Sequence, residues 1–284
     1  MLRKLFRYDM KYTAKLVLPL MLLTLGTTLM GSIAMRLMST ASDYQNSFAA
    51  TLLSGVLGLI IFGSILILVA FAVISSIIVF VRYYKHFFSD EGYLTHTLPV
   101  KTSTHMFSKT WSTLLWVIIT TVAVLFFVFL YVLIGSAPRG ALLNTAVFTE
   151  IGEFFHYLIP EMTASYWLIA LESILGILVS IVFATFMIFT AITIGAVVAK
   201  KHKVLAAIGF YYLINTAVSI ITVLIYMIVF TSVGSNAIMA GMIYNQPESL
   251  VHFTLIFSAV FYLALSAGGF ALCNHFLKKK LNLA

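Results

Sequence analysis

Residues 51–81 read TLLSGVLGLIIFGSILILVAFAVISSIIVFV and contain no charged side chain. A helix that crosses the hydrocarbon core of a membrane needs about 20 mostly apolar residues, and this stretch exceeds that length. A second uncharged stretch covers residues 110–137, after a polar segment at residues 82–109. The two stretches predict membrane-spanning helices, and the polar segment between them is then a loop outside the membrane.

The composition of the whole chain agrees with this interpretation. Of 284 residues, 62% are hydrophobic and 9% are charged, and the mean hydropathy is +1.07. A soluble domain has about 25% charged residues. No linker or low-complexity tract interrupts the chain, so we expect one all-α transmembrane domain over residues 1–284, with six spans. The predicted spans are Leu16–Met35, Phe48–Val81, Thr110–Ala137, Ala164–Ala199, Val204–Val233 and Leu250–Leu277.

The basic residues gather on one side of the predicted membrane. With six spans both termini share a side, and that side holds all 17 lysines and arginines except Arg36 and Arg139, which leaves 15. Lysine and arginine are in excess in cytoplasmic loops. We therefore predict that both termini and residues 82–109 are cytoplasmic. The net charge of +8 then lies near the inner leaflet, and no nucleic-acid partner is expected. The opposite side holds the acids Asp43, Glu150, Glu153, Glu161 and Glu248.

Two segments outside the spans have the pattern of amphipathic helices. In residues 1–15, basic residues recur every four positions, which is typical of a helix that lies among lipid headgroups. We expect an interfacial elbow there, bent near Pro19, rather than a cleaved signal peptide. In residues 138–163, apolar residues at i, i+3, i+4 and i+7 predict an extracellular surface helix. We favour a connector over an exit gate for this helix. The stripes are Arg3, Arg7, Lys11 and Lys15, then Ile151, Phe154, Phe155 and Leu158.

Motifs of common enzymes are missing from the sequence. It contains no phosphate loop of the form G-x-x-x-x-G-K-[ST], no H-E-x-x-H and no G-x-S-x-G. The spacing of His86, His96 and His105 matches no common zinc pattern. Asp90 and Glu91 are adjacent, so on a helix their side chains diverge by about 100°. We expect no enzymatic activity and no cofactor or metal in this chain.

The polar segment has features of a docking site. Asp90 and Glu91 suit the first turn of a short helix, where the helix dipole favours negative charge. Pro99 ends such a helix, because the residue before a proline avoids the helical conformation. Phe88 and Tyr93 are apolar for a cytoplasmic loop. They either insert into the groove of a partner protein or rest on the bilayer surface, and the residues alone leave both alternatives open.

The string FFSDEGYLTHTLPV at residues 87–100 and the opening MLRKLFRYDMKY resemble the bacterial (Firmicutes-type) ABC-2 permease family, as do Ser108, Lys109 and Trp111 downstream. The resemblance covers the amino-terminal helix, the second and third spans with their loop, and the six-span layout. It implies a half-transporter that pairs with a second copy or a sister permease, and with two ATP-binding-cassette subunits that bind ATP and Mg. It implies that the loop carries the coupling helix, a role that falls on Asp90, Glu91, Gly92, Tyr93 and Leu94, bounded by Phe88 and Pro99.

The expected function is therefore that of a permease subunit in the bacterial plasma membrane. ATP hydrolysis by the partner would drive export of an amphiphilic substrate, such as an antimicrobial peptide or another hydrophobic compound. The alternative is a membrane-embedded scaffold or sensor subunit that docks a cytosolic partner without transport. A stand-alone ion-coupled transporter is disfavoured, because it would need ionisable residues near the midplane of the membrane.

Polar residues inside spans line a path for substrate or pack helices together. Tyr211, Asn215, Ser219 and Tyr226 follow one stripe of the fifth span, and we consider them a possible substrate path. Glu172 is expected at the outer headgroups, as a solvated or paired acid. For small-residue stripes in the fourth and sixth spans we predict helix packing. These stripes contain Gly176, Ser180 and Ala184, then Ser258, Tyr262, Ser266, Gly269 and Cys273.

Overall fold

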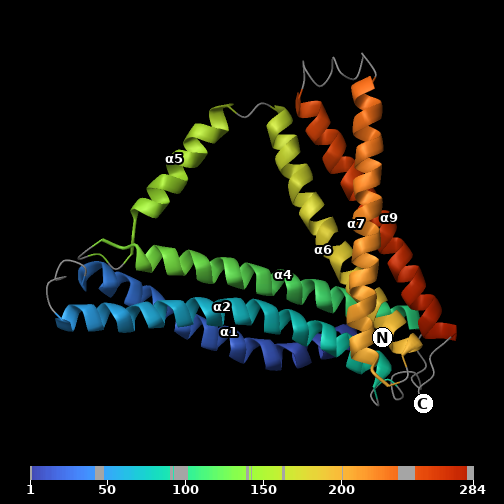
Figure 1. The fold of residues 1–284 in the computed structure, drawn as a ribbon, viewed down its shortest axis with the longest axis horizontal. Coiled ribbons are helices and arrows are strands. Elements are labelled where there is room, and N and C mark those ends of the chain that lie inside the picture. The colour runs from blue at the N-terminus through green and yellow to red at the C-terminus, as the bar shows by residue number, and fades with distance from the viewer. Residues whose placement is uncertain are drawn as a thin grey trace. The chain divides into compact units, whose positions relative to one another are not determined.

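The computed structural model describes residues 2–41, 48–89, 92, 102–138, 141, 143–161, 164–199, 201–235 and 247–279. These residues form helices and no strand (Figure 1). Six of the helices are long and apolar enough to cross a membrane, which confirms the predicted number of spans. The helices are α1 (Leu2–Ala41), α2 (Phe48–Phe88), α4 (Thr102–Gly135), α5 (Ala146–Glu161), α6 (Ala164–Val198), α7 (Lys203–Ser235) and α9 (Pro247–Lys279).

The helices extend beyond the predicted spans at their polar ends. Helix α1 is one element that runs through Pro19, so residues 2–15 share a helix with the first span. Helix α2 continues past Val81 to Phe88, and α4 already begins at Thr102. Lysine, arginine and tyrosine accept helical conformations and keep their polar ends in water, so polar residues alone do not end a helix. Of the predicted loop, only residues 89–101 remain between the two helices.

The chain divides into two compact units that alternate along the sequence. We call residues 3–81 and 111–161 the amino unit, and residues 1–2, 82–110 and 162–284 the carboxyl unit. The polar segment thus falls in the same unit as α6, α7 and α9.

In the amino unit, α1, α2 and α4 run side by side (Figure 1) around one apolar cluster. Phe71 of α2 and Phe127 of α4 are buried there, with ring centroids 6.0 Å apart. Val17 of α1 and Trp116 of α4 complete its centre. Large side chains that point away from this cluster stay exposed, as expected of helices whose outer faces meet lipid.

Small and hydroxyl-bearing residues allow a close approach of these three helices. A Cβ atom at Gly31 of α1 would lie 2.1 Å from Ser64 Oγ and 2.9 Å from a ring carbon of Tyr131. The neighbouring Thr24 and Thr28 are buried, and each hydroxyl donates to a carbonyl of its own helix at 2.7 Å. These internal bonds satisfy polar groups without water, as the interior of a membrane protein requires.

Helix α5 is attached at its first turn to the end of α4. The backbone N–H of Asn144 donates to the carbonyl of Leu133 at 2.8 Å, and its side-chain amide donates to Ser136 Oγ. The side-chain oxygen of Asn144 accepts from the N–H of Ala146, a helix-capping bond. An amphipathic helix was predicted in this segment, and its exposed Ile151 belongs to the predicted apolar stripe.

In the carboxyl unit, α6 contacts both α7 and α9 (Figure 1). The stripe predicted for the sixth span packs as expected, since a Cβ atom at Gly269 would meet Thr190 Oγ1 at 3.0 Å. Tyr262 stacks on Phe183 at 4.7 Å. For the stripe in the fourth span, the predicted helix packing is wrong at Ala184, whose side chain is exposed. Phe183 takes the inward position, where the stacking of its ring on Tyr262 holds it.

Candidate functional site

The end of α2 is anchored to α6 by a buried tyrosine. Tyr83 is 1% exposed, and its ring lies parallel to that of Phe189, with centroids 3.8 Å apart and planes 8° apart. Its hydroxyl lies 3.0 Å from Thr193 Oγ1. The Thr193 hydroxyl donates to the carbonyl of Phe189 at 2.7 Å, so Tyr83 acts as the donor to Thr193. One residue at the start of the polar segment is therefore held by both stacking and a hydrogen bond.

Helix α9 contributes to the same contact through Cys273. Its sulfur lies 3.6 Å from the hydroxyls of both Thr190 and Thr193, and the side chain is fully buried. The thiol thus packs as a small residue, which confirms the prediction for Cys273. We call Tyr83, Phe189, Thr190, Thr193 and Cys273 the Tyr83 cluster. It joins α2, α6 and α9 within the carboxyl unit.

The other side of the loop is anchored as well. Phe107, in the second turn of α4, contacts Phe270 of α9 with ring centroids 4.9 Å apart. Phe270 in turn meets Phe186 of α6 edge-on at 6.0 Å. Residues 89–101 therefore connect two helix ends, of which the end of α2 packs on α6 and the start of α4 packs on α9. Aromatic residues are common at membrane interfaces, so no sequence pattern indicates which spans Tyr83 and Phe107 contact.

Two of the predicted coupling residues lie in the described part of the chain. Phe88 is half-buried, and its ring stacks on Tyr84 at 6.1 Å. Gly92 is buried, and its N–H donates to the carbonyl of Ser89 at 2.7 Å. A Cβ atom at Gly92 would lie 2.7 Å from the carbonyl oxygen of Phe87. The turn after α2 thus needs glycine at this position.

The remaining coupling residues fall outside the described residues. They are Asp90, Glu91, Tyr93, Leu94 and Pro99. The structure describes residues on both sides of them. After α2, the N–H of Gly92 donates to the carbonyl of Ser89, and α4 begins at Thr102.

The residues considered as a substrate path share one stripe of α7 and differ in how far they are buried. Tyr211 and Tyr226 are half-buried, and Tyr226 meets Phe257 of α9 edge-on at 5.9 Å. Asn215 and Ser219 are exposed. Tyr226 thus contributes to helix packing.

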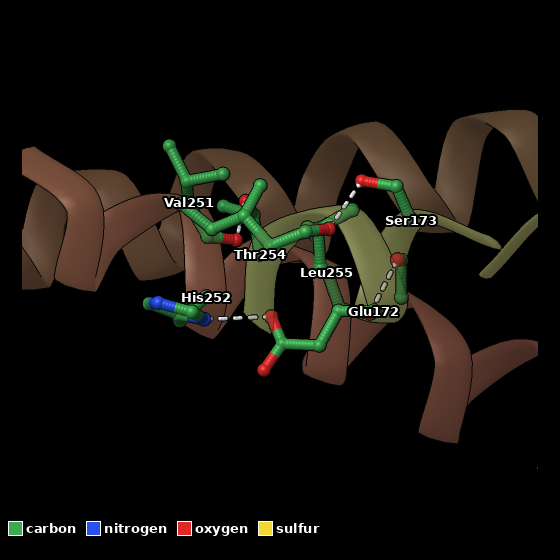
Figure 2. A network of polar contacts seen from close by, with 8 residues as sticks. Glu172, Ser173, Val251, His252, Thr254 and Leu255 are labelled. Carbon is green, nitrogen blue, oxygen red and sulfur yellow. Dashed lines mark hydrogen bonds and ion pairs between the residues drawn. The ribbon is translucent and has the colours of Figure 1, made fainter. Parts of the chain in front are cut away.

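At the opposite end of the unit, α6 and α9 are linked by a polar pair (Figure 2). His252 Nδ1 lies 2.7 Å from Glu172 Oε2, and the side chains are 23% and 22% exposed. This agrees with the expectation that Glu172 is paired near the end of its span. Its partner, His252, was not predicted from the sequence. A signal was available, because both residues lie a few positions inside the predicted outer ends of two spans.

The described residues contain no group of three His, Cys, Asp or Glu side chains that could hold a metal ion. Comparison with known proteins finds no match to a family model, to a curated protein or to a solved structure.

Proposed function

We propose that this chain is the membrane-spanning permease subunit of a bacterial ABC-2-type exporter. The observation that supports the proposal most is the anchoring of the polar loop. Of the two helix ends that flank residues 89–101, the end of α2 packs on α6 through Tyr83, and the start of α4 packs on α9 through Phe107. A force applied to this loop would reach two membrane-spanning helices directly.

The Tyr83 cluster is the part that would transmit such a force. A stacked ring pair and a buried hydrogen bond break together if α2 slides along α6, so the helix ends move as one body. Rigid packing of this kind converts a local displacement into a shift of whole helices. In the proposed mechanism, the ATPase subunit binds the loop through Tyr93, Leu94 and the acids Asp90 and Glu91. Its closure on ATP then displaces α6 and α9.

The partner subunits would supply the energy. The sequence has no phosphate loop, so ATP and Mg would bind to two separate ATP-binding-cassette chains. A second permease copy or a sister permease would complete the membrane domain. The substrate would be amphiphilic, such as an antimicrobial peptide. Asn215 and Ser219 would face the substrate path between the two permeases, because both residues are exposed on α7.

Photo-cross-linking at position 93 tests the proposal. With the neighbouring ATPase co-expressed, a photoreactive residue in place of Tyr93 should capture that subunit. The Tyr93→Ala variant should reduce co-purification of the ATPase by roughly 30-fold, the effect of removing a central aromatic anchor. The matched control is Tyr8→Ala, since Tyr8 is 74% exposed on α1 and lies outside the loop.

Two outcomes would contradict the proposal. Capture of lipid alone from position 93 would mean that the loop rests on the bilayer. Capture of an ATPase whose hydrolysis never responds to any amphiphilic compound would favour the scaffold or sensor subunit instead.

A further inference from the structure

A pocket of about 400 Å³ lies where α6 is connected to α7, and it is independent of the loop described above. Its polar wall is formed by Lys201, Lys203 and Tyr84, with His202 beside them. Within the described residues neither lysine forms an ion pair. Two unpaired ammonium groups at one small pocket attract an anion, and a tyrosine hydroxyl can donate a further hydrogen bond.

The other wall of the pocket is aliphatic and open. It is formed by Val204, Leu205 and Ile208 in the first turns of α7. These side chains are strongly exposed, with Leu205 at 73%. A soluble phosphate compound would gain nothing from such a surface. A molecule with a charged head and apolar chains would contact both walls at once.

The position of the pocket along the helices fits the membrane boundary. The pocket lies between the end of α6 at Val198 and the first turns of α7. Tyr84 lies one turn before the end of α2. Headgroups meet acyl chains at this level of a bilayer, and basic pockets between spans on the cytoplasmic side are typical sites of anionic lipid headgroups.

We propose that this pocket binds the anionic headgroup of a phospholipid, with the phosphate at Lys201, Lys203 and Tyr84 and the acyl chains along Leu205 and Ile208. The proposal requires only that α6 and α7 span a membrane, and it does not depend on the transport function. A bound lipid would bridge the end of α2 to the start of α7, two elements of the same unit.

Native mass spectrometry of the full-length protein with phosphatidylglycerol tests this site. The double variant Lys201→Gln/Lys203→Gln should lose roughly 30-fold in affinity for phosphatidylglycerol, from the loss of two lysines near the headgroup. Phosphatidylcholine, which carries no net charge, should bind weakly to both proteins. The matched control is Arg36→Gln/Lys278→Gln, which removes the same charge from positions on α1 and α9 outside the pocket and should retain binding. Unchanged melting temperatures would show that the variants are folded.

Two results would overturn the proposal. An equal loss of phosphatidylglycerol in both double variants would mean a general charge effect and no site. Competition by inorganic phosphate as effective as that by the lipid would mean a soluble anion site. The variant Leu205→Ser separates these sources, because it should weaken binding of the lipid and leave binding of phosphate unchanged.

Discussion

At the scale of single residues, close approaches decide which positions tolerate change. Gly92 and Gly195 both lack room for a side chain, since a Cβ atom would meet backbone atoms at 2.7 Å and 2.5 Å. Gly92 was singled out from the sequence because it lies in the string FFSDEGYLTHTLPV. No sequence pattern indicates Gly195, because its contact with Ala207 exists only once α6 and α7 are packed together.

The Gly195→Ala substitution should destabilise the carboxyl unit. Its Cβ atom would lie 2.5 Å from the Cα and N atoms of Ala207, and neither backbone can move without separating the helices. Overpacking of this kind costs about 1–3 kcal/mol, or a fall of roughly 2–4 °C in melting temperature for each kcal/mol. Thermal unfolding of the purified protein in detergent measures the effect.

The control for this substitution is Gly209→Ala in α7. A Cβ atom at Gly209 meets nothing within 4 Å, and alanine is favoured over glycine inside a helix by roughly 0.5–1 kcal/mol. Its melting temperature should stay equal or rise. If both variants melted at the same temperature, the close contact between Gly195 and Ala207 would be wrong.

At the scale of helices, apolar length predicted which elements exist, and it did not predict where they end. The spans at residues 48–81 and 110–137 were identified, but α2 and α4 extend to Phe88 and back to Thr102. Tyrosine, lysine and histidine fill these extra turns, and helical geometry suits them as well as a loop does. The sequence also does not predict which helices pack together, because the faces that meet lipid and the faces that meet other helices are equally apolar.

The pair of Glu172 and His252 tests the contact between α6 and α9. In a double-mutant cycle with Glu172→Gln and His252→Gln, we expect a coupling free energy of about 1 kcal/mol. The value is modest because both side chains remain partly exposed. Thermal unfolding of the four proteins provides the measurement.

Ser173→Ala is the matched control for the cycle. The Ser173 hydroxyl donates only within its own helix, to the carbonyl of Ile169 at 2.7 Å (Figure 2). Combined with His252→Gln it should show no coupling. A cycle on Glu172 and His252 that is additive within error would rule out a stabilising link between the two helices there.

At the scale of the whole molecule, the sequence predicted one membrane domain of six spans, and the structure adds that it consists of two interleaved units. Charge asymmetry gives an orientation, because it depends only on where basic residues lie along the chain. The division into units follows from contacts far apart in sequence, such as Tyr83 with Thr193, which no local pattern records.

Cysteine labelling tests the orientation. In a Cys273→Ala background, the single variants Asp43→Cys, Glu153→Cys and Glu248→Cys should react with a membrane-impermeant maleimide added to intact cells. Glu91→Cys and Lys279→Cys should react only after the membrane is permeabilised, since both belong to the basic side. Labelling of position 279 in intact cells would reverse the predicted topology.

The long separation of Tyr83 from its partners has a consequence for how the protein is made. Tyr83 leaves the ribosome 110 residues before Thr193, which at about 5–20 residues per second is a delay of roughly 5–20 s. For most of that interval the residues of α6 and α9 that contact the aromatic end of α2 have not been synthesised. Nascent chains that stop before α6 would therefore carry an exposed aromatic patch, which makes them targets for membrane chaperones and quality-control proteases.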